Sequence, residues 1–387
     1  MMESAIVIGG NHHNTLGVIR SLGKNGIFSD VIMCCKGKDS YVLKSKFINK
    51  SCVVSNYNEA VNILLHEWKT EEKQVVICAS DGAASSIDKH RYSLINSYYL
   101  PGCEEQGRLT MLMNKSVMTD LAIECGLNVP KSVVLDKNGA VSNDVPFPCI
   151  LKPIKSIDGS KSDISVCRSD SELVEKLKSV RSDKIQAQSF IEKVLEYQLI
   201  GLSWGGVIIP GRTHIISQPL VTNTGFLRYE HLDGTEPIDE CKSFIRETGY
   251  SGLFSMEFIR DKAGIDYFME INFRNDGNSI CVTEAGVNLP SIWYSLCKNP
   301  RLELESIDLT IKDIYVMPEF DEIRLWSAQE ISLRRFYKEM KQADIYMEYS
   351  PEDPHPTHGK IDFWKKFLIT ALFKRPGRIM LGRNKKR

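Results

Sequence analysis

The sequence lacks several patterns that would assign it to common functional classes. Its eleven cysteines form no CxxC pair and show no regular spacing, which argues against a disulfide framework and against a zinc site. No signal peptide is visible, so we expect reduced thiols and a cytoplasmic location. No apolar run approaches the length needed to span a bilayer, and no internal repeat is present.

A large net charge is absent as well. The chain carries 49 Lys and Arg residues against 49 Asp and Glu residues, so nothing predicts a nucleic acid partner. The charges are unevenly distributed, with about ten basic residues and one acid between Lys360 and Arg387. Residues 361–373 have the pattern of a short amphipathic or mostly apolar helix. It would either lie peripherally on the inner face of an anionic membrane or dock on the protein body.

The dinucleotide-binding fingerprint GxGxxG is also missing. An apolar run at 5–8 is followed by a glycine pair, a helical segment and a second apolar run at 30–34, which is the opening of a doubly wound α/β domain. The first glycines, Gly9, Gly10 and Gly17, do not have the fingerprint spacing, and this disfavours NAD binding.

Two polar loops follow apolar strands farther along the chain. Residues 74–79 predict a buried parallel strand, and residues 80–82 follow it at the end where such sheets place binding loops. Residues 147–153 predict another strand, which carries Lys152 near its end and leads into a small polar turn at 155–162. A lysine beside a flexible turn suits phosphate contact, although an exposed lysine with no ligand fits the pattern too.

The most informative stretch reads as a β-hairpin, with strands at 253–260 and 265–273 around a polar connection. A four-residue connection would pair Arg260 with Ile265 and place Glu257 opposite Phe268. Side chains alternate between the faces of a strand, so Phe268 would share its face with four polar side chains: Glu257, Glu270, Asn272 and Arg274.

Two carboxylates, an amide and a guanidinium on one patch have two interpretations. Unpaired carboxylates repel each other, and Mg²⁺ together with phosphate oxygens would neutralise them, with Arg274 facing the same phosphates. Alternatively, the patch is a solvated hairpin face with a cross-strand ion pair. A three-residue connection would reverse the alternation and weaken the metal interpretation.

Taken in order, these motifs resemble the ATP-grasp superfamily of carboxylate–amine ligases, over about residues 4 to 300. The chain looks most like the branch related to carbamoyl-phosphate synthetase, biotin carboxylase and D-aspartate ligase. Its most specific part is Glu257 with the run Glu-Ile-Asn-Phe-Arg at 270–274, which is similar to the family's Glu followed by Glu-Ile-Asn-x-Arg. The resemblance implies that Glu257, Glu270 and Asn272 hold two Mg²⁺ ions, with Mn²⁺ as a substitute. It also implies that Arg274 supports the reacting phosphate.

The resemblance also implies an ATP site. Lys115 and Lys152 resemble the two ATP lysines, and Lys152 is expected to contact the α-phosphate and take part in catalysis. Gly159 and Ser160 resemble the mobile glycine loop. The adenine hinge is resembled by Gln188, Ser189, Phe190 and Ile191. Glu196 resembles the acid that binds the ribose. The family often has Glu where Gln188 stands, and the loop at Gly159 is poor in glycine.

The implied fold combines α/β and α+β parts: an N-terminal Rossmann-like domain, a two-lobed ATP-grasp unit and a basic helical tail. The expected boundaries are 1–110 for the first domain, 111–184 for the small lobe, 185–310 for the large lobe and 311–387 for a C-terminal extension. The implied activity joins a carboxylate to an amine through an acyl phosphate, forming ADP and phosphate. Alternatives are a carboxylase or carbamoyl-phosphate type of enzyme and a non-catalytic nucleotide-binding regulator.

The substrates are less defined than the chemistry. The branch favours attachment of an amino acid to a cell-envelope or surface-polysaccharide precursor, or formation of a small metabolite, and a homodimer would fit. Arg228 and His231 precede the hairpin and are either contacts for a carboxylate substrate or surface residues. Glu284 and Asn288 follow the hairpin and are candidates for the acceptor pocket.

Overall fold

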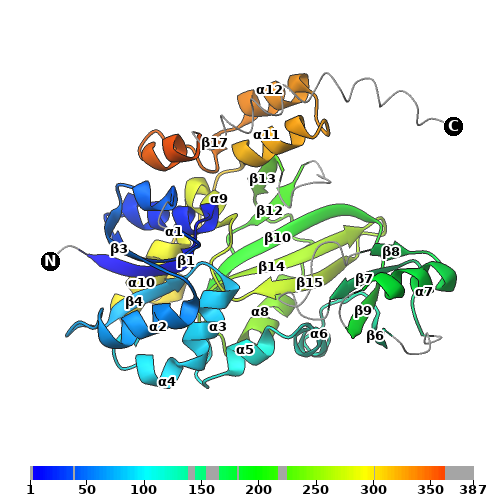
Figure 1. The fold of residues 1–387 in the computed structure, drawn as a ribbon, viewed down its shortest axis with the longest axis horizontal. Helices are drawn as coiled ribbons and strands as arrows, with labels where there is room; N and C mark the ends of the chain where they lie inside the picture. The colour runs from blue at the N-terminus through cyan, green and yellow to red at the C-terminus, as the bar shows by residue number, and fades with distance from the viewer. Residues whose placement is uncertain are drawn as a thin grey trace.

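The computed structural model describes residues 3–37, 40–137, 144–153, 165–180, 183–216, 225–299 and 301–361, and these form three β-sheets with helices packed around them (Figure 1). The predictions that concern Gly159, Ser160 and the chain beyond residue 361 lie outside the described residues. No helix in the described part of the chain is long and apolar enough to cross a membrane.

The first sheet is parallel and has the strand order β3-β2-β1-β4-β5. Its strands are β1 (Ser4–Gly10), β2 (Phe28–Cys34), β3 (Ile48–Val54), β4 (Gln74–Cys78) and β5 (Tyr98–Tyr99). The chain moves outward from β1 to β3 and then crosses to β4 on the other side, which creates a topological switch point between β1 and β4. Open α/β sheets bind ligands outside the carboxyl ends of the strands at such a point.

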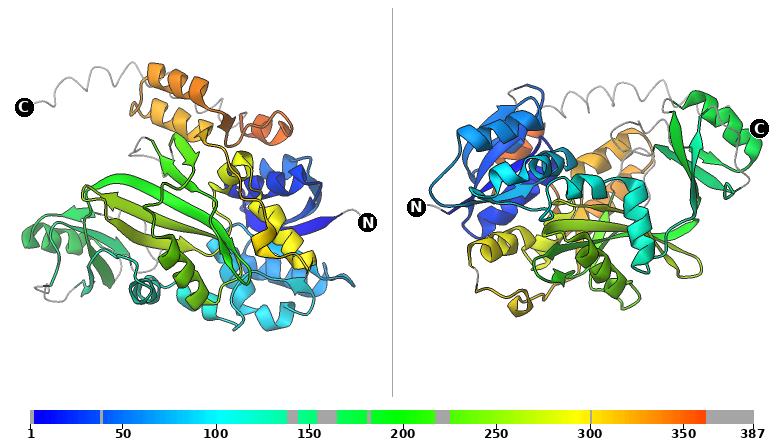
Figure 2. Two further views of the ribbon diagram at one scale, coloured as in Figure 1. Left: turned by 180° about the vertical axis from the view of Figure 1, so that it is seen from behind. Right: turned by 90° about the horizontal axis from the view of Figure 1, so that it is seen from below.

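Helices cover both faces of this sheet because its strands are apolar on both faces. Ala5 and Val7 of β1 belong to one core, whereas Ile6 and Ile8 belong to the other. The first core includes α1 (His13–Lys24), α9 (Ser279–Ala285) and α10 (Leu289–Lys298), which lie together in Figure 2. The second includes α2 (Tyr57–His66), α3 (Asp81–Lys89) and α4 (Arg91–Leu94). Helices α9 and α10, which come late in the sequence, therefore cover one face of the N-terminal sheet together with α1.

The largest sheet has eight strands and carries the predicted hairpin. Its order is β15-β14-β10-β12-β13-β16-β17, with β11 paired to β10. The strands are β10 (Lys193–Ser203), β11 (Val207–Ile208), β12 (Arg212–Ile215), β13 (Leu227–Glu230), β14 (Gly252–Asp261), β15 (Asp266–Asn272), β16 (Ile314–Met317) and β17 (Ile345–Tyr346). Helices α5 (Arg108–Leu112), α6 (Lys115–Glu124) and α8 (Ile238–Thr248) contribute to the core beneath it.

The hairpin forms as predicted, but its register differs. Arg260 pairs with Asp266 rather than Ile265, and Phe258 rather than Glu257 lies opposite Phe268. The register then shifts so that Glu257 faces Glu270, which leaves Met269 as an extra residue in β15. Phe268, 1% exposed, therefore points into the core, on the opposite face from Glu270. The prediction that Phe268 shares the polar face was wrong, because simple alternation cannot foresee a bulge.

The third sheet is antiparallel and forms a small lobe with a core of its own. Its order is β6-β9-β7-β8, with β6 (Ser132–Asp136), β7 (Cys149–Pro153), β8 (Ser165–Cys167) and β9 (Lys184–Ser189). Helix α7 (Asp170–Ser179) packs on it through Leu173 and Leu177. Lys152 and Gln188 therefore lie on adjacent strands.

The chain beyond residue 301 is more regular than its sequence suggests. After η3 (Leu304–Ser306) come β16, α11 (Glu319–Ser327), α12 (Leu333–Gln342) and β17, and residues 355–361 are helical. This extension is tied to α1 by a buried ion pair, in which the Arg20 Nε lies 3.0 Å from an oxygen of Asp353. Arg20 also donates to the backbone oxygens of Glu348 and Asp353, each at 2.7 Å.

Candidate active site

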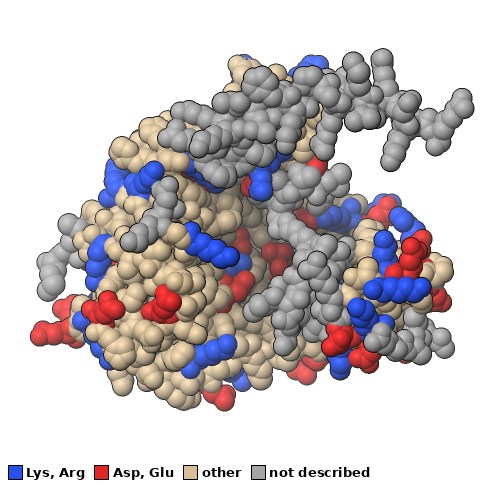
Figure 3. Space-filling view, viewed as in Figure 1, with Lys and Arg blue, Asp and Glu red and all other residues tan. Residues whose placement is uncertain are grey.

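Three polar side chains form a row across the three strands at the end of the large sheet. Gln198 of β10 pairs with Glu257 of β14, and Glu257 pairs with Glu270 of β15. The Gln198 Nε2 donates to Glu257 at 3.1 Å, and the Asn272 Nδ2 donates to the same oxygen at 3.3 Å. Figure 3 shows a hollow near the middle of the molecule with acidic side chains inside it. The two glutamates predicted to bind metal are therefore neighbours on one face.

Burial and charge repulsion leave Glu257 poorly suited to ionise by itself. The pKa of Glu257 is raised to about 8, mainly by burial and then by the nearby charges of Glu270 and Asp276. A divalent cation would remove this penalty, because it would neutralise both carboxylates at once. The donor set therefore fits an oxygen-liganded metal ion.

The composition of the set favours Mg²⁺ over transition metals. Within the described ranges, no group of three His, Cys, Asp or Glu side chains is placed to hold a metal ion. Two carboxylates with an amide match the way Mg²⁺ is held, since it takes one or two carboxylates and completes its shell with phosphate oxygens and water. Asn272 turns its nitrogen toward Glu257 and its oxygen toward Arg274, so its amide would have to rotate to join such a site.

Arg274 is fixed by contacts on several sides. Its NH2 donates to the Asn272 oxygen at 3.0 Å, its NH1 to Asp276 at 2.9 Å, and its Nε to Asp81 at 3.1 Å. Burial alone would lower the pKa of Arg274, but the charges of Asp276 and Asp81 outweigh it and raise the pKa. The guanidinium is therefore charged and held in one orientation beside the residues predicted to bind metal.

The contact with Asp81 places this site at the switch point of the first sheet. Asp81 begins α3, directly after β4. The backbone N–H of Asn275 donates to the Cys78 oxygen at 3.0 Å, and the Asn14 Nδ2 donates to the Asn275 oxygen at 2.7 Å. The turn after β15 thus docks on the carboxyl ends of β1 and β4, and the N-terminal domain forms one wall of the site.

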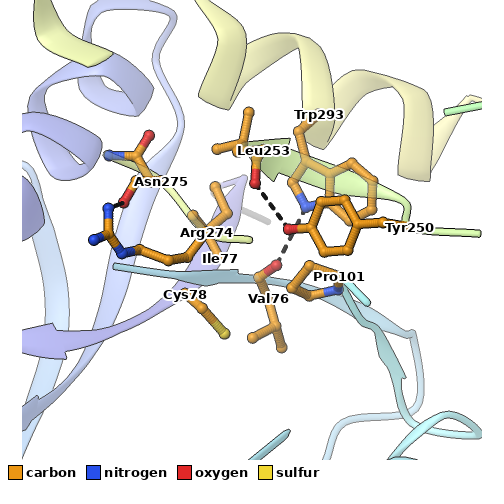
Figure 4. Close-up of a pocket in the computed structure, with 9 residues that line it drawn as sticks. All are labelled: Val76, Ile77, Cys78, Pro101, Tyr250, Leu253, Arg274, Asn275 and Trp293. Atoms are coloured by element: carbon orange, nitrogen blue, oxygen red, sulfur yellow. Dashed lines mark hydrogen bonds between the residues drawn. The ribbon is translucent and has the colours of Figure 1, made fainter. Parts of the chain in front are cut away.

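A small cavity lies behind Arg274. Figure 4 shows that its guanidinium is directed toward Asn275 and away from Tyr250 and Trp293, which line the same cavity. The cavity measures about 10 Å³, which is close to the space of a single water molecule. The Trp293 Nε1 donates to the Val76 oxygen at 3.2 Å, so this ring ties α10 to β4.

The two predicted ATP lysines approach the same row from the small lobe and from α6. The Lys115 Nζ lies 3.9 Å from Glu270. The Lys152 Nζ donates to the Gln188 Oε1 at 3.0 Å. Burial lowers the pKa of Lys152, and the charge of Lys115 adds to this, while Glu270 and Glu257 act in the opposite direction. Two cations near two carboxylates form a site that is ready to receive phosphate oxygens.

The predicted adenine hinge connects β9 to β10. Ser189 donates its backbone N–H to the Lys131 oxygen at 2.8 Å, and Phe190 donates to the Pro148 oxygen at 2.8 Å. The Phe190 side chain is exposed and Ile191 is half-buried, which leaves an apolar edge at the junction between the lobes. Glu196 lies in β10, two residues before Gln198 and on the same strand face, and it contacts Lys193. Their roles toward ATP stay predictions.

Other sequence candidates have structural partners instead. Arg228 and His231 both contact Asp313, at 3.0 and 2.8 Å, and are at least partly exposed. Glu284 forms an ion pair with Lys24 at 2.6 Å. Asn288 caps α10 and donates to the backbone oxygen of Ser21, so it stabilises the packing of α10 on α1. The acceptor-pocket role of these two residues stays a prediction.

Sequence reasoning did not single out three side chains that complete the site. Asp81 was visible only as part of a predicted binding loop. Gln198 could have been found from its two-residue spacing from Glu196, which places both on one strand face. Asp276 follows Arg274 in a polar turn, and its oxygens accept from both Arg274 and the backbone of Asn278.

We compared the chain with known proteins by sequence and by structure. No protein-family model matches the chain. The 2-oxoglutarate carboxylase small subunit of Hydrogenobacter thermophilus is 24% identical over 238 residues, which are 54% of this chain and 50% of that protein. The chain thus spans about half the length of this relative.

Solved structures match over most of the chain. An L-amino acid ligase from Bacillus licheniformis gives a TM-score of 0.62 at 16% identity, covering 81% of this chain and 79% of that one. An ADP complex of PurK, N5-carboxyaminoimidazole ribonucleotide synthetase, gives a TM-score of 0.65 at 15% identity, covering 85% of both chains. The chain therefore shares the overall fold of these proteins, which is the ATP-grasp fold.

Proposed function

We propose that the protein is an ATP-dependent carboxylate–amine ligase that forms an acyl phosphate and releases ADP and phosphate. The observation that carries this proposal is the row Gln198, Glu257 and Glu270, with Arg274 held beside it. A purely structural hairpin face would gain little from two adjacent carboxylates that repel each other. A site that receives Mg²⁺ and phosphate needs such an arrangement.

The residues divide the work of the reaction. Glu257, Glu270 and Asn272 would hold Mg²⁺, which would neutralise phosphate oxygens and so reduce their repulsion of an incoming carboxylate. Lys152 and Lys115 would hold the phosphates by charge from the other side. Arg274, oriented by Asp81 and Asp276, would stabilise the charge on the transferred phosphoryl group.

The chemistry proceeds in two displacements. A carboxylate oxygen of the substrate attacks the γ-phosphorus of ATP, the bond to the bridging oxygen breaks, and ADP leaves. An amine then attacks the acyl carbon, loses a proton, and expels inorganic phosphate. The acyl phosphate hydrolyses in water, so the site must exclude solvent while it exists. The junction between the small lobe and the large sheet is the surface that would close over it.

The test is release of ADP and phosphate from Mg²⁺ and ATP, with and without hydroxylamine, over a panel of L- and D-amino acids and sugar acids. Hydroxylamine intercepts an acyl phosphate, so a hydroxamate identifies the carboxylate without knowledge of the amine. We expect at least one acid to give a hydroxamate, and Glu270→Gln to give none. If the protein binds ATP but no acid of the panel stimulates release of ADP and phosphate, amino acids and simple sugar acids are refuted as substrates. If no acid stimulates release and ATP does not bind, the result would favour the regulatory alternative.

A carboxylase is the second candidate, because the matched sequence relative is a carboxylase subunit. The ligase and the carboxylase differ in the acid that each requires for release of ADP. A carboxylase releases ADP only when bicarbonate is present, whereas the ligase responds to an organic acid in bicarbonate-depleted buffer. If a hydroxamate forms, its acid also decides whether the product belongs to a cell-envelope or surface-polysaccharide precursor or to a small metabolite.

A further inference from the structure

A second cleft of about 680 Å³ lies where β5 and the loop after it meet the ends of β10 and β14. None of the residues assigned above to Mg²⁺ or ATP lines it. Its volume lies in the range of pockets that hold small organic ligands, about 300 to 1,000 Å³. The lining combines aromatic rings with charged side chains, which distinguishes it from a packing defect between apolar layers.

The charged residue at the centre of the inference is Arg91. It is 7% exposed, and its NH1 donates to the Pro101 oxygen at 3.2 Å. Its Nε is buried and has no hydrogen-bond partner, and no ion pair involving Arg91 is found among the described residues. The nearby carboxylate of Asp88 is occupied by the N–H groups of Gly107 and Thr110 and by the Thr110 hydroxyl. A buried guanidinium without a carboxylate is costly, and an anion would offset that cost.

Burial disfavours the charged form of Arg91, as expected for a cation without a paired counter-ion. It lowers the pKa of Arg91, and the opposing charges of Asp88 and Glu104 do not cancel the effect. Glu104 and Glu105 are exposed, whereas Arg91 is the buried charge of the lining. Electrostatics in the buried part of the cleft therefore favour a negatively charged group.

Aromatic rings supply the rest of the surface. Tyr99 and Trp204 are half-buried, and the Lys73 Nζ lies 5.7 Å from the centre of the Tyr99 ring. Trp204 packs edge-on against Trp293, with ring centres 5.4 Å apart. Partly exposed rings beside cations suit a ligand with a flat apolar body, because it can stack while its charged end reaches a guanidinium.

We propose that this cleft binds a small organic anion whose aromatic or apolar body lies against Tyr99 and Trp204 and whose carboxylate or phosphate accepts hydrogen bonds from Arg91. The site is separate from the proposed ligase chemistry and does not depend on it. It is nevertheless adjacent to that machinery, since Trp293 lines both this cleft and the small cavity beside Arg274 (Figure 4). Trp204 and Trp293 also make binding visible by their fluorescence.

The experiment titrates the full chain, free of nucleotide, with 3-phenylpropanoate, indole-3-acetate and phenyl phosphate, and with the uncharged amides of the two carboxylates. Binding is followed by calorimetry, with tryptophan fluorescence where the probe permits it. We expect at least one anion to bind, and its amide to bind about tenfold more weakly or not at all, since a charge-assisted hydrogen bond is lost.

Variants locate the site. Arg91→Gln should weaken the anion about tenfold, whereas Arg301→Gln, which changes an exposed arginine outside the cleft, should leave it unchanged. Trp204→Leu should weaken both the anion and its amide, and it remains informative if Arg91→Gln does not fold. No binding of any anion up to about 10 mM, equal binding of acid and amide, or affinity unchanged in both Arg91→Gln and Trp204→Leu would each overturn the proposal.

Discussion

Replacing Glu257 by Gln should make the ligand-free protein more stable at pH 8 while abolishing its activity. The pKa of Glu257 is raised from its ordinary 4.5 to about 8, mainly by burial and then by Glu270. The folded state therefore holds a proton that the unfolded chain has lost between these pH values. The contribution of Glu257 to the free energy of unfolding is therefore fully present below pH 4.5 and is lost as the pH rises toward 8.

The magnitude follows from the size of this shift. Each pKa unit corresponds to about 1.4 kcal/mol, so complete ionisation in the folded state would cost at most ~5 kcal/mol. The glutamine keeps an acceptor for Gln198 but replaces charge-assisted hydrogen bonds by neutral ones, so we expect a net gain of about 2 to 3 kcal/mol at pH 8. At pH 5 the gain should be below ~1 kcal/mol, because Glu257 is then still protonated in the folded protein.

The assay is thermal unfolding of both proteins at pH 5 and pH 8, without nucleotide or metal. In a chain of this length the gain at pH 8 should raise Tm by about 2 to 4 °C. Glu192→Gln is the matched control, since that carboxylate is 75% exposed and pairs with exposed Lys262. A Glu257→Gln protein that is less stable than wild type at pH 8, or a difference that does not change with pH, would refute the reasoning.

Three further outcomes are expected. Glu270→Gln and Asn272→Ala should abolish turnover while leaving the far-ultraviolet circular dichroism spectrum unchanged, and near-wild-type phosphate release in either would contradict the metal assignment. Lys152→Met should raise the KM for ATP by about tenfold, because a charge that contacts phosphate is lost, and an unchanged KM would count against the phosphate role. Arg20→Met should lower the free energy of unfolding by about 3 kcal/mol, because the buried Asp353 would lose the positive charge that balances it, and denaturant titration measures this loss. An unaltered midpoint would show that the C-terminal extension is not anchored there.

Much of the fold was readable from local pattern. The alternation of apolar and polar residues in the hairpin, the glycine pair that ends β1 and the lysine next to the last residue of β7 are each encoded within a few consecutive residues. The resemblance to ATP-grasp proteins rests on such segments, and the structural comparisons confirm it as a fold. The ligand roles of Glu257, Glu270, Asn272 and Arg274 remain predictions, although the structure brings these four side chains together.

The remainder depended on contacts between distant parts of the chain. The sequence by itself determined which side chains the hairpin carries, because strand periodicity is a local property. Only the tertiary structure decided the bulge at Met269, because burying Phe268 in the core requires the strand to shift by one residue. It alone also decided that Asp81 holds Arg274, since these residues are 193 positions apart and meet only where the hairpin docks on the first sheet. Local pattern thus specifies the chemistry that each segment can offer, and long-range packing specifies which segments offer it together.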